Sequence, residues 1–119
     1  MNTRQFLFIF GRSPRGGVID REMLDQMLTL AAFDQAITVL FVDEGVYRLT
    51  RDMDATASIL KPSELLDLLT FYDIDSVWVE EESLMQRDMS LDDACLSVRI
   101  MPRAAVAGLL ARHDVILGD

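Results

Sequence analysis

The apolar run at Gln5–Phe10 (QFLFIF) restricts the fold more than any other feature of this sequence. A strand that meets water on one face alternates apolar and polar residues, whereas a strand covered on both faces is apolar almost throughout. A loop dense in glycine and proline follows at Gly11–Gly17, and Asp20 is a suitable N-cap for a helix after it. The apolar stripe of that helix consists of Met23, Leu24, Met27, Leu28 and Ala31. A buried strand followed by an amphipathic helix predicts a parallel α/β sheet.

The same alternation of strand and helix continues to the end of the chain. Further strands are predicted at Ala36–Val42, Ser76–Val79, Leu96–Ile100 and Asp114–Leu117. Helices are predicted at Pro62–Tyr72, at Ser83–Arg87 and from Pro102 onward, the last with Ala105, Val106, Leu109 and Leu110 inward. Val46, Tyr47 and Leu49 fit a short helical turn, and Arg51–Thr56 has the composition of a loop. We therefore predict one domain over residues 1–119, a three-layer α/β/α sandwich of flavodoxin-like size around a mainly parallel five-stranded sheet. The alternation in LSVRI indicates that its strand lies near a sheet edge.

The net charge of −9 argues against direct contact with nucleic acid. Phosphate binding needs a basic face, and this sequence has a single lysine, Lys61. No apolar stretch is long enough to cross a bilayer, and the N-terminus lacks the features of a secretory signal. We expect a cytoplasmic protein with no membrane partner, in which Cys95, the one cysteine, forms no internal disulfide.

Carboxylates gather after two of the predicted strands. Asp43 and Glu44 follow the second strand, and Glu80, Glu81 and Glu82 follow the third. Oxygen ligands of this kind suit Mg²⁺ or Ca²⁺, but adjacent glutamates point in different directions and no spacing matches a metal loop. We therefore expect a solvated acidic rim, with no catalytic residue, no metal ion and no cofactor.

The loop Gly11–Gly17 is a candidate anion site because it joins the first strand to the first helix. Arg12 and Arg15 suit an anion, but neither the Walker pattern nor the dinucleotide fingerprint is present. A tight turn that uses glycine for its backbone freedom is the alternative. The sequence leaves open whether this loop binds an anion or a nucleotide.

Cys95 and His113 are the remaining candidates for chemistry. Cys95 precedes the fourth strand, at the end of the sheet opposite the usual site, and the nearby Asp92 and Asp93 disfavour a thiolate. A small buried apolar residue is the simpler interpretation of this cysteine. His113, at the end of the last helix, is placed to bond the final carbonyl groups.

Several segments, taken in order, resemble the TusC/DsrF family of sulfur-relay proteins. They are QFLFIF with SPRGG and REMLDQMLTLAAFD, then FVDEGVYRL, FYDIDSVWVEEESLMQR and ARHDVIL. The resemblance covers nearly the whole chain. It implies a DsrE/F/H-like fold with a five-stranded sheet.

The resemblance also implies partners. TusC is similar to TusB and TusD, and the three form a dimer of heterotrimers that accepts persulfide sulfur from TusA and passes it to TusE for 2-thiolation of tRNA wobble uridine. In sulfur oxidisers the related complex is DsrEFH. The cysteine that carries the persulfide belongs to the TusD/DsrE subunit, just after its third strand. The corresponding segment here, Val79–Glu82, has no cysteine, so the resemblance implies a non-catalytic structural subunit.

Two surfaces are predicted from this comparison as interface candidates. Val46, Tyr47 and Leu49 form an apolar step that we expect to be exposed and to contact a partner. Glu80, Glu81 and Glu82 are expected to shape an interface and to repel a persulfide anion. A DsrF role in sulfur oxidation and a persulfide carrier that uses Cys95 remain alternatives, and the oligomeric state of the isolated chain is open.

Overall fold

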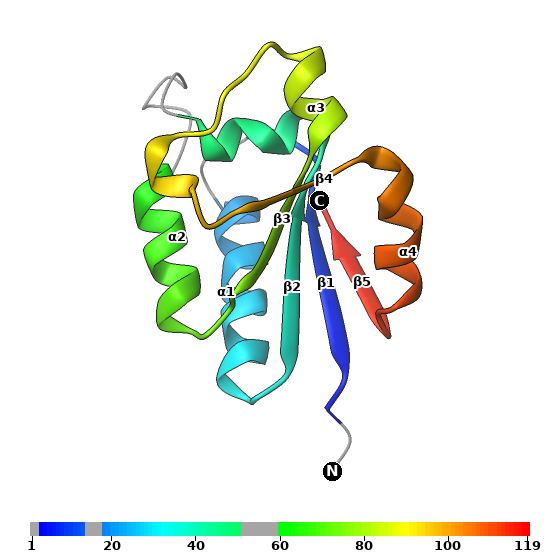
Figure 1. Ribbon diagram of the computed structural model, residues 1–119. Coiled ribbons are helices and arrows are strands. Elements are labelled where there is room, and N and C mark those ends of the chain that lie inside the picture. Colours follow the sequence, from blue (N-terminus) through cyan, green and yellow to red (C-terminus); the bar gives the residue numbers. More distant parts are fainter. Residues whose placement is uncertain (1–2, 14–17, 51–59) are drawn as a thin grey trace.

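The computed structural model describes residues 3–13, 18–50 and 60–119, and its centre is a five-stranded sheet (Figure 1). The strands are β1 (Gln5–Phe10), β2 (Ala36–Phe41), β3 (Ser76–Glu80), β4 (Arg99–Met101) and β5 (Val115–Gly118). Their order is β4-β3-β2-β1-β5, and every neighbouring pair is parallel. The predicted five-stranded parallel sheet is confirmed, and β4 lies at its edge as the alternation in LSVRI indicated.

Helices cover both faces of the sheet, but unequally. The α-helices are α1 (Val18–Ala32), α2 (Pro62–Phe71), α3 (Glu81–Gln86) and α4 (Val106–Ala111), and the 3₁₀ helices are η1 (Asp43–Leu49), η2 (Asp93–Cys95) and η3 (Arg103–Ala105). The larger core lies between the sheet and α1, α2, η1 and η2, and includes Phe8, Phe10, Val39, Phe41 and Val79. The smaller core, Leu7, Leu40, Met101 and Leu109, lies under α4. This arrangement confirms the three-layer α/β/α sandwich.

The apolar character of the central strands follows from this layering. Phe8 of β1 faces the larger core while Leu7 faces the smaller one, and both side chains are fully buried. Successive side chains of a strand point to opposite faces, so a strand with a core on each side must be apolar at every position. QFLFIF is such a strand from Phe6 to Phe10, and its polar first residue, Gln5, is exposed.

The turns that follow α1 and α2 each contain an aspartate in the left-handed region. Asp34 has φ 61° and Asp73 has φ 60°. Short polar side chains tolerate this conformation better than others do, and it is common where a helix ends. The two turns lead into β2 and β3, which are hydrogen-bonded neighbours.

Several predicted boundaries were wrong. α1 begins at Val18, so Asp20 lies inside the helix and is not its N-cap. The strand predicted at 96–100 is shorter and later, because Asp92 accepts the N–H of Ala94 at 2.9 Å and starts η2, which delays β4 to Arg99. The loop predicted at 51–56 lies outside the described residues. Among the helices that the structure describes, none combines the length and the apolar character needed to span a bilayer.

Candidate functional site

The carboxyl end of β3 holds the acidic run Glu80–Glu82. β3 ends at Glu80 and α3 begins at Glu81, with no loop between them. Ligand sites in parallel α/β folds gather at this edge of the sheet. The Glu80 side chain is buried, with a relative exposure of 7%, whereas Glu81 is exposed and Glu82 is half-buried.

Ser83 and Arg103 hold the Glu80 carboxylate in place. Its Oε1 accepts a hydrogen bond from the Ser83 hydroxyl at 2.5 Å and another from Arg103 Nη2 at 2.9 Å. The Ser83 hydroxyl oxygen in turn accepts the backbone N–H of Asp43 at 2.8 Å. The buried carboxylate therefore ties the end of β3 to η1 on one side and to η3 on the other.

Arg103 is shared among three side chains of the β3–α3 segment. Besides bonding Glu80, it donates its backbone N–H to Glu82 Oε1 at 2.8 Å, and its Nη2 lies 3.4 Å from Gln86 Oε1. The Arg103 side chain is 47% exposed, so only the Glu80 end of the ion pair is withdrawn from water. The Arg103 guanidinium thus lies against the Glu80 carboxylate at the edge of the sheet.

This environment sets the charge state of Glu80. Burial alone would raise the pKa of the Glu80 carboxyl, but hydrogen bonds from Arg103 and Ser83 and attraction to Arg103 and Arg87 outweigh it. The net result is a pKa below the ordinary value of 4.5. Glu80 is therefore ionised at neutral pH, with Ser83 and Arg103 as hydrogen-bond donors to its carboxylate.

The expectation of three solvated glutamates was wrong for Glu80. A buried, ionised carboxylate must be paired, and the partner that makes burial acceptable is Arg103. Asp43 and Glu44 are exposed, as expected of a rim. In the described ranges, no three side chains of His, Cys, Asp or Glu converge as a metal site would require.

The apolar step at Val46, Tyr47 and Leu49 is not the exposed surface that the sequence suggested. η1 does form the short helical turn predicted there, but Val46 and Leu49 are fully buried in the larger core and Tyr47 is half-buried. Gly45 allows this by bringing η1 against β1: a Cβ on Gly45 would lie 1.8 Å from the Phe10 carbonyl oxygen. The step packs within the domain because η1 folds back onto the end of the sheet.

Cys95 ends η2 and is fully buried in the larger core. Its Sγ lies 3.6 Å from the Leu49 carbonyl oxygen. Burial, together with the nearby negative charge of Asp92, raises the pKa of the Cys95 thiol to about 11. A buried thiol of this kind is a poor nucleophile, so the geometry disfavours the carrier alternative.

Two candidates from the sequence remain, the loop Gly11–Gly17 and His113. Of the loop Gly11–Gly17, only Gly11, Arg12 and Ser13 are described, so its possible anion site lies mostly outside the described residues. His113 bonds the end of α4 as predicted, with Nδ1 2.6 Å from the Leu109 carbonyl oxygen.

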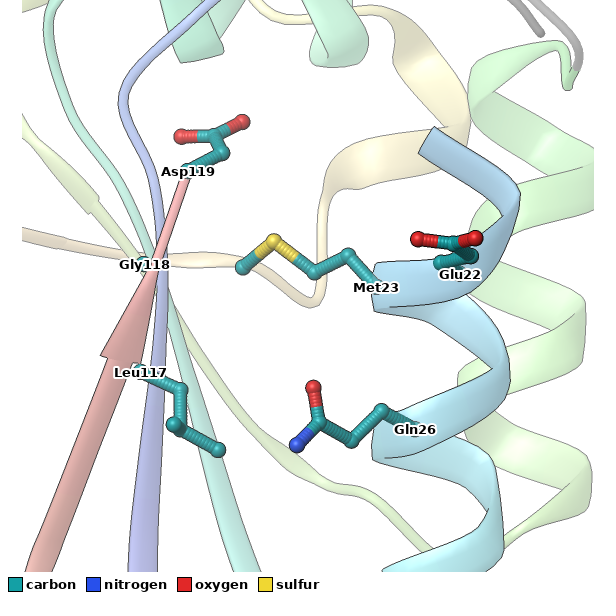
Figure 2. Close-up of a pocket in the computed structure, with 6 residues that line it drawn as sticks. All are labelled: Glu22, Met23, Gln26, Leu117, Gly118 and Asp119. Atoms are coloured by element: carbon teal, nitrogen blue, oxygen red, sulfur yellow. The ribbon is translucent and has the colours of Figure 1, made fainter. Parts of the chain in front are cut away.

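A cavity of about 230 Å³ opens between α1 and β5, away from the Glu80 network. Its described lining is Glu22, Met23, Gln26, Leu117, Gly118 and Asp119. Figure 2 shows Met23 and Gln26 projecting from α1 towards β5. The Asp119 carboxylate is already engaged, since Oδ1 accepts the Gly11 N–H at 2.7 Å and Oδ2 lies 3.5 Å from Arg48. None of these six described residues forms a nucleophile–base pair with another.

Comparison with known proteins identifies the family. The model of the DsrE/DsrF-like family matches residues 4–117. This chain belongs to the DsrE/DsrF-like family. Its relatives include a protein TusC homolog of Vibrio vulnificus (strain CMCP6), 30% identical over 95% of this chain and 97% of the relative, and a TusC homolog of Pasteurella multocida, 34% identical over 92% and 95%. The intracellular sulfur oxidation protein DsrF of Allochromatium vinosum is 35% identical over 76% of this chain and 68% of its own length. The resemblance to the TusC/DsrF family is confirmed.

A solved structure supports the fold independently. The crystal structure of the ychN protein from E. coli matches with a TM-score of 0.74, covering 98% of this chain and all of the other, at 15% identity. At that identity the likeness concerns the fold alone. It agrees with the DsrE-like α/β sandwich that the family match indicates.

Sequence reasoning missed Ser83 and Arg103, the two side chains that define the site. A signal for Arg103 was present in the sequence. The ends of adjacent parallel strands meet at one edge, and Glu80 is in register with Met101 at the end of β4. A base two residues after that strand is therefore placed to meet an acid that ends the neighbouring strand.

Proposed function

We propose that this chain is a non-catalytic structural subunit of a TusBCD-type sulfur-relay complex. In that complex, TusB-like and TusD-like sister subunits would assemble with it as a dimer of heterotrimers. The assembly would take persulfide sulfur from a TusA-like donor and pass it to a TusE-like acceptor for 2-thiolation of tRNA wobble uridine. This chain would contact neither tRNA nor membrane.

The proposal rests on the residues at the β3–α3 junction, which include glutamates and no cysteine. A sulfur carrier of this family needs a reactive cysteine there. In this chain the corresponding segment, Val79–Glu82, has no cysteine, and its Glu80 is bonded by Ser83 and Arg103. Cys95, the one cysteine, is buried elsewhere with a pKa raised to about 11. The similarity to curated TusC homologs over almost the whole chain supports the same role.

A DsrF-like role in intracellular sulfur oxidation is the second candidate. It is favoured by the 35% identity to the Allochromatium vinosum protein of that name. The two candidates differ in the partners and in the final acceptor of the sulfur, which lie outside this chain.

Deleting the gene in its own organism tests both candidates. The relay role in tRNA modification predicts loss of 2-thiouridine from wobble positions, measured by mass spectrometry of digested tRNA, and its recovery when Cys95→Ala is supplied on a plasmid. Normal 2-thiouridine combined with impaired oxidation of stored sulfur would favour the DsrF role. Recovery by the wild type but not by Cys95→Ala would contradict the non-catalytic assignment.

A further inference from the structure

Two phenylalanines at the ends of neighbouring helices are left in water. Phe33, directly after α1, is 71% exposed, and Phe71, the last residue of α2, is 80% exposed. The Phe71 ring meets Tyr72 edge to face, with centroids 5.4 Å apart. Large apolar side chains exposed together at one end of a domain commonly mark a contact surface.

The topology brings these rings to one edge of the molecule. β2 and β3 are adjacent and parallel, with Thr38 in register with Ser76. Phe33 and Phe71 each precede their registered strand residue by the same number of positions. The turns after α1 and α2 therefore lie next to each other at the amino ends of the strands, and Figure 1 shows both helices ending at that edge, opposite α3.

The same edge is acidic. Asp34, Asp73 and Asp75 lie in these two turns, and all three are exposed. Among the residues that the structure describes, none of the three carboxylates is in an ion pair. The basic residue Arg4 is also at this edge, since its backbone carbonyl accepts the N–H of Ala36. The apolar centre is thus bordered by an excess of negative charge.

We propose that this edge, the surface made of Phe33, Asp34, Phe71, Tyr72, Asp73 and Asp75, docks another protein subunit whose contact face is apolar and bordered by Lys or Arg. The inference rests on the proposed function, in which that subunit is a sister subunit of the relay complex. Together the two phenylalanine rings offer on the order of 300 Å², over a third of the area that one partner contributes to a standard interface.

The negative charge of this surface favours a basic protein subunit over a second copy of this chain and over an anionic membrane. A second copy of this chain carries the same net charge of −9 and would place carboxylates against carboxylates. An anionic membrane surface would be repelled by the three aspartates. A basic protein surface gains from the same charges, which would speed its association and make the association sensitive to salt.

The test uses the full-length tagged chain co-expressed with the TusB-like and TusD-like subunits of its own organism. The double variant Phe33→Ser/Phe71→Ser is compared with Met85→Ser/Leu96→Ser, which removes two side chains of similar exposure, 69% and 88%, at other sites. We expect the first pair to lower the recovery of sister subunits by at least about tenfold and the second pair to leave it unchanged. Circular dichroism of each variant checks that it is folded.

Two further variants test whether the aspartates of this surface contribute to docking. Asp34→Asn and Asp73→Asn remove the charge while asparagine still tolerates the positive φ of both positions. We expect slower association at low salt and a weaker dependence of the association rate on NaCl.

Each outcome decides something different. If the wild type recovers no sister subunits, the proposed function fails and this inference fails with it. If the wild type and Phe33→Ser/Phe71→Ser recover them equally, the docking surface is wrong and the proposed function stands. Light scattering that shows a dimer of the isolated chain, abolished by Phe33→Ser/Phe71→Ser, would assign the surface to a second copy, and flotation with anionic vesicles would assign it to a membrane; either result overturns the inference.

Discussion

The Arg103 guanidinium lies 2.9 Å from the Glu80 carboxylate, although the two residues are 23 positions apart in the chain. This ion pair joins the end of β3 to η3, which leads into α4. It occupies the edge of the sheet where parallel α/β proteins place their chemistry. The pair thus explains how the first of three adjacent glutamates is buried at this edge.

Removing the arginine should destabilise the fold. Arg103→Ala leaves the buried Glu80 carboxylate with one fewer donor, so we expect the free energy of unfolding to fall by more than it does in the control variant. Urea denaturation at pH 7 measures this. The matched control is Arg21→Ala on the exposed side of α1, which should change stability by less than about 0.5 kcal/mol. Equal effects of the two variants would contradict the role given to the ion pair.

The same pair predicts how stability depends on pH. Because the pKa of folded Glu80 lies below its ordinary value of 4.5, the carboxylate binds protons less readily in the folded state than in the unfolded chain. Its contribution should be present above pH 4.5 and be lost as the pH falls through the folded pKa. Urea denaturation of the wild type and of Glu80→Gln from pH 7 to pH 3 tests this, with the difference between them shrinking at the acid end. A difference that grows on acidification would refute the assignment.

Gly45 and Gly108 form a second matched pair. A Cβ at Gly45 would lie 1.8 Å from the Phe10 carbonyl oxygen, whereas a Cβ at Gly108, within α4, would meet no atom within 4 Å. Gly45→Ala must displace backbone, so we expect it to cost more than about 2 kcal/mol. Gly108→Ala should stabilise by about 0.5–1 kcal/mol, since alanine is the better helix former. Thermal unfolding of both variants checks the prediction, and a tolerated Gly45→Ala would show that η1 does not lie against β1.

Cys95 should be chemically inert in the folded protein. The rise of its pKa from 9.0 to about 11 lowers the thiolate population near neutral pH by about 100-fold, and burial adds a barrier to access. Alkylation by iodoacetamide at pH 8 should therefore be at least about 100-fold slower in the native protein than in 8 M urea, where the thiol is unperturbed. Comparable rates in the two states would show that the thiol is accessible.

Local pattern was sufficient to predict the central part of the fold. Gln5–Phe10 was predicted with its observed boundaries, and the starts of β2 at Ala36 and β3 at Ser76 were also correct. These strands are buried on both faces, so their own composition reports their position. At the edge, β4 is short and its start depends on the Asp92 cap of η2, which the apolar pattern does not encode.

The site was less predictable because it depends on contacts that are distant in sequence. Three consecutive glutamates indicate a solvated rim unless a base arrives from elsewhere, and Arg103 does so only when β4 pairs with β3. Val46 and Leu49 suggest an exposed step unless η1 folds back, and that requires Gly45 against Phe10. In both places a tertiary contact decided what the local pattern left open.

The location of the sulfur tests the central claim most directly. The complex, purified with its sister subunits, is incubated with a cysteine desulfurase, L-cysteine and the TusA-like donor, and each subunit is then weighed by intact-mass spectrometry under non-reducing conditions. We predict the added mass of one sulfur atom on a sister subunit and none on this chain, whose Cys95 remains an unmodified thiol. Sulfur on Cys95 that is subsequently passed to the TusE-like acceptor would contradict the account.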